Sequence, residues 1–120
     1  MPKTVLITGA GSGFGRDAAA QLAGRGHSVI ATVETDAQAA ALSAAHPELT
    51  VARLDITKPD DLAKLPAPFD WVVNCVSSSK GGVEEYREVY FNGTRHLVEW
   101  LSSAPPKRFV YTSSTSVYGQ

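Results

Sequence analysis

Residues 8–15 read Thr8-Gly9-Ala10-Gly11-Ser12-Gly13-Phe14-Gly15, and they carry more structural information than any other segment of this chain. They directly follow an apolar run, Thr4-Val5-Leu6-Ile7, that is typical of a buried strand. A segment with helical spacing, residues 16–22, comes directly after them. A strand, a glycine-rich turn and a helix in this order hold the pyrophosphate of a dinucleotide in parallel sheets. The sequence therefore predicts a dinucleotide site at the start of the chain.

Each glycine of this loop has a physical role in that prediction. Gly9 can turn the chain out of the strand at any φ, and Gly13 lets the backbone approach the phosphates without a Cβ. Gly15 lets the helix pack tightly against the sheet, and the free N–H groups of its first turn face the phosphate charge. The intervening residues of the predicted cofactor loop are Gly11, Ser12 and Phe14. No Lys-Ser or Lys-Thr pair follows the glycines, which argues against a mononucleotide P-loop.

Glu34 is the candidate ligand for the adenosine ribose. It follows the next apolar run, 19 residues after Gly15, close to the spacing expected for an acid that binds the ribose 2′-hydroxyl. No Arg or Lys stands at Ser12 or just after Glu34 to hold a 2′-phosphate. The pattern favours NAD as the cofactor, with NADP as the alternative. A solvated turn residue is the other interpretation of Glu34.

Composition excludes several classes of protein. The chain has 120 residues, 43% hydrophobic and 19% charged, with a net charge of −1, as in an ordinary globular domain. This balance predicts binding of neither nucleic acid nor membrane, and the Met-Pro-Lys start predicts no signal peptide. The single cysteine, Cys75, excludes an internal disulfide and suits a cytoplasmic protein. The histidines lack metal-ligand spacing, so we expect no metal site.

Strand and helix patterns alternate along the whole chain. We expect strands over residues 3–8, 28–33, 50–54, 70–76 and 108–113, and helices over 13–25, 36–45, 59–65 and 83–103. This alternation predicts an α/β fold, a Rossmann-type doubly wound parallel sheet of five strands in the order 3-2-1-4-5 with helices on both faces. The cofactor should cross the carboxyl ends of the first and fourth strands, where the strand order reverses.

Polar residues at the carboxyl ends of the later strands are further candidates. Asp55 can accept a hydrogen bond from the adenine amino group while the N–H of Ile56 reaches the ring; alternatively, Asp55 starts the next helical turn. Asn74 interrupts an apolar strand, and we expect it to bond within the structure. Cys75 is expected to be a small core residue. Hydroxyl side chains crowd residues 111–118, after the fifth strand.

Two segments strengthen a family resemblance that the glycine loop introduces. The loop resembles that of the short-chain dehydrogenase/reductase superfamily. The sequence Arg108-Phe109-Val110-Tyr111-Thr112-Ser113-Ser114-Thr115-Ser116-Val117-Tyr118-Gly119 resembles the matching segment of its extended branch, the NAD-dependent epimerase/dehydratases. So does Gly93-Thr94 followed by His96-Leu97-Val98-Glu99. The resemblance covers essentially the whole chain.

The resemblance implies roles for particular residues. Asp55 and Ile56 match the adenine contact, and Val76 and Ser77 match the stretch that lines the cofactor ribose. Ser114 matches the catalytic Ser/Thr that hydrogen-bonds the substrate oxygen. The family fold thus implies hydride transfer between NAD and a sugar-like alcohol, with a nucleotide sugar as the small-molecule substrate.

Departures from the family pattern limit what this chain is expected to do. The Tyr-x-x-x-Lys pair that transfers the proton is absent, so we expect residues 1–120 to be the front part of a longer protein that binds cofactor without turnover alone. The glycine spacing follows the shorter reductase pattern, and Tyr90 replaces a common asparagine, as in atypical members of the family.

Rival functions remain open at this level. A non-catalytic NAD(P) sensor or interaction module could use the same fold, and so could an NADP-dependent reductase. A FAD-binding domain also uses such a loop, but the Ser114–Gly119 motif argues against it. Phe109 and Val110 lie in an expected edge strand, which predicts either a homo-oligomer through this edge or a longer chain that covers it.

Overall fold

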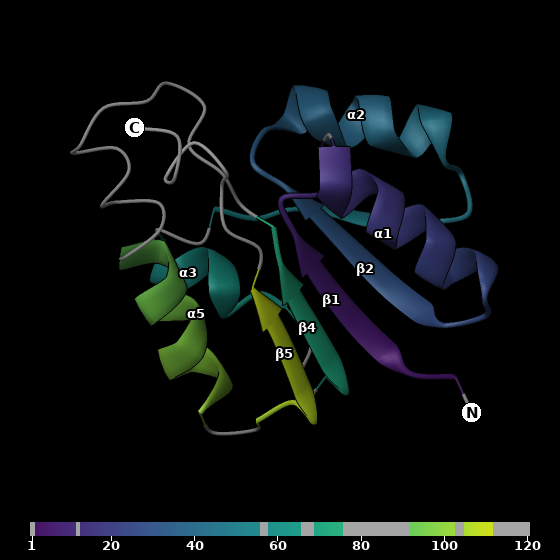
Figure 1. Ribbon diagram of the computed structural model, residues 1–120. Helices are drawn as coiled ribbons and strands as arrows, with labels where there is room; N and C mark the ends of the chain where they lie inside the picture. The colour runs from purple at the N-terminus through teal and green to yellow at the C-terminus, as the bar shows by residue number, and fades with distance from the viewer. Residues whose placement is uncertain are drawn as a thin grey trace, which may run out of the picture.

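The computed structural model describes residues 2–11, 13–55, 58–65, 69–75, 92–102 and 105–111. Strands and helices alternate in this part of the chain, and its strands form one parallel sheet (Figure 1). The elements are β1 (Thr4–Thr8), α1 (Gly13–Gly24), β2 (Ser28–Val33), α2 (Asp36–Ala45), β3 (Thr50–Arg53), α3 (Pro59–Leu62), β4 (Trp71–Asn74), α5 (Thr94–Leu101) and β5 (Arg108–Tyr111).

The strand order is β3-β2-β1-β4-β5, as predicted. β1 is central, because Leu6 is in register with Ile30 of β2 on one side and with Val72 of β4 on the other. The chain builds outward from β1 through β2 to β3, and then crosses back to add β4 and β5. The order therefore reverses between β1 and β4, which is where α/β proteins of this type hold their ligands.

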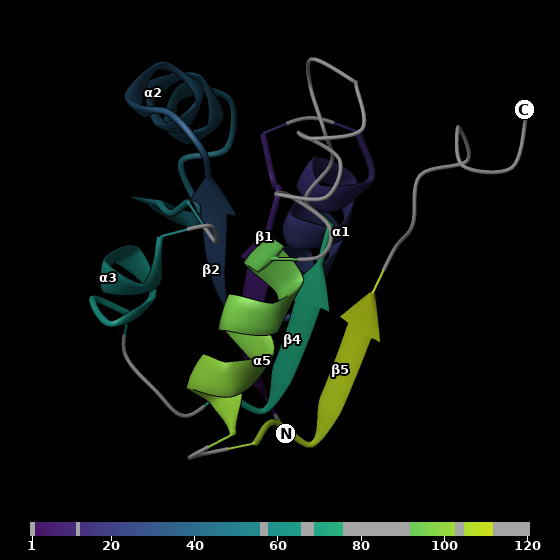
Figure 2. The same ribbon diagram turned by 90° about the vertical axis from the view of Figure 1, so that its left-hand side faces the viewer.

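β1 supplies side chains to two hydrophobic cores, one on each face of the sheet, because successive side chains of a strand point to opposite faces. Ile7 joins Ala19 of α1 and Leu42 of α2 in one buried cluster. Leu6 joins Leu62 of α3 and Leu97 of α5 in the other. In Figure 2, α5 accordingly lies in front of β4 and α1 lies behind it. The predicted covering of both faces by helices is confirmed.

Most element boundaries agree with the predicted ones to within a residue or two. α3 ends at Leu62 instead of residue 65, because the N–H groups of Lys64 and Leu65 bond the carbonyls three residues back and the chain continues as tight turns. The helix expected over 83–103 is described only over Thr94–Leu101. No helix within the described ranges combines the length and the apolar character that a membrane span requires.

Candidate functional site

The glycine loop has the backbone geometry that its sequence predicts. Gly9 and Gly13 adopt positive φ values of 71° and 58°, in the region that favours glycine. A Cβ on Gly15 would lie only 2.3 Å from the carbonyl oxygen of Gly9 and 3.1 Å from the Cβ of Cys75, so α1 packs directly on the end of the sheet. A Cβ on Gly13 would meet nothing within 4 Å, so the loop is open on that side. This geometry fits a pyrophosphate held by the first turn of α1.

Other residues of the loop are also placed. Ala10 donates its N–H to the carbonyl of Thr32 at 2.9 Å, which ties the loop to β2. Gly11 is partly buried, and the Phe14 side chain is 69% exposed. Because the Phe14 ring has so little contact with the protein, it is accessible to a bound ligand. Ser12 lies outside the described residues.

Glu34 follows β2 at the same edge of the sheet, and Gln38 fixes its backbone. The Gln38 side-chain oxygen accepts the N–H groups of Glu34 and Thr35, each at 3.1 Å, while Thr35 Oγ1 accepts the Gln38 N–H. This reciprocal pair is a capping box at the start of α2. A Cβ on Gly11 would lie 3.2 Å from Gln38 Nε2, so the Gln38 amide lies between the glycine loop and the corner after β2. Gln38 was not among the predicted site residues, although the Thr35-x-x-Gln38 spacing is typical of a capping box.

Asp55 follows β3, again at the carboxyl edge. Its N–H donates to Oδ2 of Asp61 at 3.1 Å, and the preceding N–H, of Leu54, donates to the carbonyl of Val33 at 2.7 Å. The corner after β3 is therefore held both by β2 and by α3. Ile56, its partner in the predicted adenine contact, lies outside the described residues.

Buried hydroxyl and amide groups link the elements beneath the site. Thr8 Oγ1 donates to Oδ1 of Asn74, and Nδ2 of Asn74 donates to Oγ1 of Thr94 at 3.3 Å. Thr8 and Asn74 are 1% and 2% exposed, so each needs a partner on folding. This chain of bonds joins β1, β4 and α5 and confirms the structural role predicted for Asn74. Cys75 is half-buried and packs against the core cluster that contains Ile7, as predicted.

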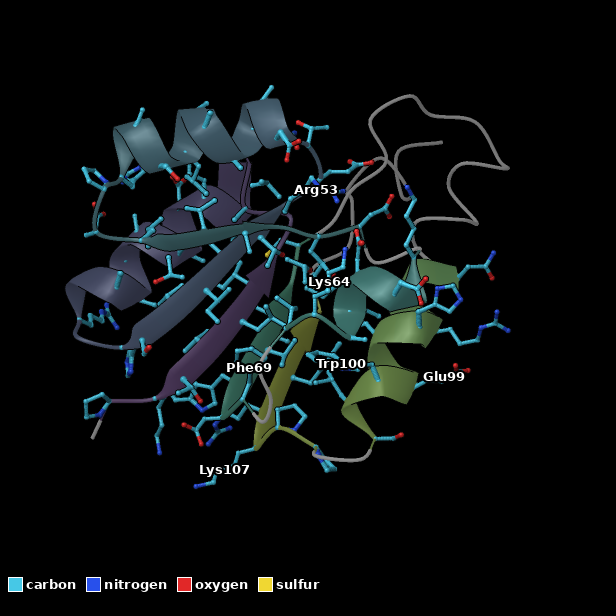
Figure 3. All side chains as sticks on the ribbon, turned by 180° about the vertical axis from the view of Figure 1, so that it is seen from behind. Arg53, Lys64, Phe69, Glu99, Trp100 and Lys107 are labelled. Carbon is cyan, nitrogen blue, oxygen red and sulfur yellow. The ribbon has the colours of Figure 1, made fainter. Side chains whose placement is uncertain are left out.

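Ion pairs surround the corner after β3. Arg53 Nε lies 3.4 Å from Oδ1 of Asp36, and Arg53 Nη1 lies 3.6 Å from Oδ2 of Asp61. Lys64 Nζ lies 3.8 Å from Oδ1 of Asp61. Figure 3 shows Arg53 near one end of α2 and Lys64 at α3. Arg53 was not among the predicted site residues, because its position opposite Val33 follows only from the pairing of β3 with β2.

A different carboxylate, Asp70, lies at the amino ends of β1 and β4, away from the candidate site. The Thr4 N–H donates to Asp70 Oδ2 at 3.0 Å, and this bond is the main cause that lowers the pKa of Asp70. Burial is the next largest effect and opposes this shift, while the Thr4 hydroxyl and the charges of Lys107 and Lys3 lower the pKa by smaller amounts. Asp70 is thus a structural carboxylate.

Several predicted site residues cannot be placed. Val76, Ser77 and Ser114 lie outside the described residues, so their roles stay predictions. Within the described ranges, no group of three His, Cys, Asp or Glu side chains is arranged to hold a metal ion.

Comparison with known proteins agrees with this geometry. The model of the NAD dependent epimerase/dehydratase family matches residues 5–120. A 3-beta-hydroxysteroid dehydrogenase from Mycolicibacterium neoaurum is 37% identical over 123 residues, which cover 94% of this chain and 32% of that protein. The chain thus spans about a third of the length of this curated relative.

Solved structures share the fold. A short-chain type dehydrogenase/reductase from Mycobacterium ulcerans superposes with a TM-score of 0.79 at 23% identity, over 95% of this chain and 52% of that one. A short-chain dehydrogenase from Sphingobium yanoikuyae in complex with NADPH superposes with a TM-score of 0.74 at 24% identity, over 99% of this chain and 56% of that one.

Proposed function

The chain belongs to the NAD dependent epimerase/dehydratase family, as its NAD(P)-binding portion, and from this premise we propose that it binds NAD in an oxidoreductase acting on a secondary alcohol. One observation carries the proposal: the close packing of Gly15 on Gly9, with Gly9 and Gly13 at positive φ, leaves the first turn of α1 open at the carboxyl edge of the sheet. NAD, when bound, supplies the hydride acceptor.

The charges near Glu34 support NAD over NADP. Glu34 is exposed beside the glycine loop, where its carboxylate can accept from a ribose hydroxyl and repels a 2′-phosphate. Arg53, in register with Val33 just before Glu34, already faces the carboxylates of Asp36 and Asp61. A 2′-phosphate would therefore compete with two protein carboxylates for one guanidinium.

The relative supports a substrate class for the proposed reaction. The 37% identity with a 3-beta-hydroxysteroid dehydrogenase supports a hydroxysteroid or a similar ring alcohol as the substrate. The family pattern over residues 108–119 also fits a nucleotide sugar, which is the second candidate. In either case Ser114 would donate a hydrogen bond to the reacting oxygen. Because the chain spans a third of that relative, turnover is a property to be measured on the product of the full reading frame.

Calorimetric titration of this chain with NAD⁺ and NADP⁺ tests the cofactor proposal. We expect NAD⁺ to bind at least about tenfold more tightly, a difference of about 1.4 kcal/mol. Glu34→Arg should weaken NAD⁺ and improve NADP⁺, whereas the matched control Glu34→Gln, which removes the repulsion but adds no cation, should improve NADP⁺ by less. Absence of binding by both dinucleotides would overturn the proposal.

The activity proposal has a separate test. The full-length protein should reduce NAD⁺ with a 3β-hydroxysteroid or with a nucleotide sugar, followed as NADH absorbance. Ser114→Ala should lower kcat by about a hundredfold or more, within the range of a lost catalytic hydrogen bond and proton relay. Tight NAD⁺ binding without reduction by either substrate class would favour a non-catalytic sensor.

A further inference from the structure

Asp61 is an unusual residue for the first turn of a short helix because its carboxylate is nearly buried. Its side chain is only 10% exposed, although aspartate is almost never buried without a partner. Taking this charge out of water is costly unless other groups compensate for the lost hydration. The contacts of Asp61 therefore indicate what its placement achieves.

Among the described residues, three groups contact the Asp61 carboxylate, from the end of β3, the corner after it and the turn after α3. Oδ2 accepts the backbone N–H of Asp55 at 3.1 Å and faces Arg53 Nη1 at 3.6 Å. Oδ1 faces Lys64 Nζ at 3.8 Å. The Lys64 side chain is 73% exposed, so that pair is weakened by solvent. The bond to Asp55 and the pair with Arg53 are the better shielded contacts.

These contacts fix the corner that follows β3. Arg53 is the last residue of β3, and its guanidinium also lies 3.4 Å from Asp36 at the start of α2. Asp61 thus connects α3 to the end of β3 and, through Arg53, to the first turn of α2. Asp55 lies within this frame, so the direction of its backbone is set by the carboxylate six residues later.

We propose that Asp61 is a positioning residue that holds Asp55 in place to recognise the adenine of the dinucleotide. This inference rests on the proposed function, in which Asp55 accepts a hydrogen bond from the adenine amino group. A carboxylate discriminates adenine from hypoxanthine, because hypoxanthine has a carbonyl acceptor where adenine has an amino donor. The discrimination requires that Asp55 be held at hydrogen-bonding distance, and Asp61 supplies that constraint.

A purely structural role for Asp61 makes a different prediction. If Asp61 only stabilises the fold, its variants should alter stability and weaken both dinucleotides equally. If Asp61 positions Asp55, its variants should change the ratio of the two affinities. The ratio of the Kd for nicotinamide hypoxanthine dinucleotide to the Kd for NAD⁺ is therefore the informative quantity.

The experiment measures this ratio by calorimetry for the wild-type chain and a set of variants. We expect a ratio of about ten for the wild type, equivalent to about one hydrogen bond. Asp55→Ala and Asp61→Ala should both bring it close to one. Asp61→Asn keeps an acceptor at the same reach and should retain the ratio, whereas Asp61→Glu keeps the charge but displaces it and should lower the ratio. Lys64→Met, the matched control, should leave the ratio unchanged.

Each outcome has a distinct meaning. Failure of the wild type to bind either dinucleotide overturns the proposed function and this inference with it. If Asp55→Ala lowers the ratio but Asp61→Ala and Asp61→Glu leave it unchanged, this inference is overturned and the proposed function is not. If Asp55→Ala leaves the ratio unchanged, the inference is also overturned, because Asp55 then makes no contact with the adenine amino group. If Asp61→Ala does not fold, the opposite responses expected of Asp61→Asn and Asp61→Glu still decide the matter.

Discussion

At the residue scale, Gly15 shows how the absence of one side chain determines the shape of the glycine loop. Its Cβ position is 2.3 Å from the Gly9 carbonyl oxygen, a backbone atom that cannot rotate away. Gly15→Ala should push the glycine loop away from α1 and abolish detectable NAD⁺ binding. It should also lower the free energy of unfolding by about 1–3 kcal/mol, as overpacking does. Calorimetry and urea unfolding measure the two effects.

Gly24 is the matched control for that substitution. It lies in the same helix, and a Cβ there would meet nothing within 4 Å. Gly24→Ala should therefore leave NAD⁺ binding intact and raise stability by at most about 0.5–1 kcal/mol, the gain of alanine over glycine inside a helix, because Gly24 is the last residue of α1. Equal losses of binding in the two variants would show that the Gly15 contact is not what shapes the loop.

Asp70 gives a pH-dependent prediction at the same scale. Its pKa is lowered in the folded chain, chiefly by the Thr4 N–H, so its ionised form favours folding. That contribution is present above its ordinary value of 3.8 and is lost as the pH falls through the lowered folded value. Asp70→Asn should be less stable than the wild type at pH 7, with a difference that shrinks below about pH 4. Chemical unfolding at both pH values measures it; a constant difference would contradict this account.

At the element scale, the start of α2 combines a helix cap with the wall of the site. Gln38→Glu preserves the side-chain acceptors for the Glu34 and Thr35 N–H groups, so stability should change by less than about 0.5 kcal/mol. It also places a second negative charge beside Gly11, close to the expected pyrophosphate. The Kd for NAD⁺ should therefore rise several-fold, as measured by calorimetry.

Variants of Thr35 distinguish the capping of α2 from an effect on NAD⁺ binding. Thr35→Ala removes the hydroxyl that accepts the Gln38 N–H and should lower stability by about 1 kcal/mol, while Thr35→Ser should retain it. Neither change adds charge near the glycine loop. If Gln38→Glu lowered stability as much as Thr35→Ala and left NAD⁺ binding unchanged, the Gln38 side chain would be a cap alone.

The elements also show what the sequence can and cannot predict. The strand order and the glycine loop were predictable because the periodicity of apolar residues and the spacing of glycines are local signals. The positive φ of Gly9, for example, depends on the backbone of that residue alone. Asp61 was not predictable as a partner of Asp55, because that contact depends on how tightly α3 turns back on β3. Contacts between side chains of different elements depend on how those elements pack, and the spacing of residues within one segment does not reveal that packing.

At the scale of the whole molecule, β1 couples the site to both cores. Its side chains enter the clusters on the two faces, and its carboxyl end leads into the glycine loop. A ligand bound at this edge should therefore stabilise the sheet and the helices on both faces together. Ligand binding should appear as a shift of a single thermal transition, because both clusters unfold with β1.

The last prediction asks which half of the dinucleotide the molecule holds. The described candidate site residues follow β1, β2 and β3, and Gly13, Glu34 and Asp55 are the ones proposed to hold the pyrophosphate and the adenosine. ADP-ribose should thus reproduce most of the rise in melting temperature that NAD⁺ causes, and nicotinamide mononucleotide should cause little. At a concentration of 100 Kd the expected stabilisation is about 2.7 kcal/mol. Glu34→Arg should reduce the ADP-ribose effect, and a larger shift with the mononucleotide would place the adenosine elsewhere.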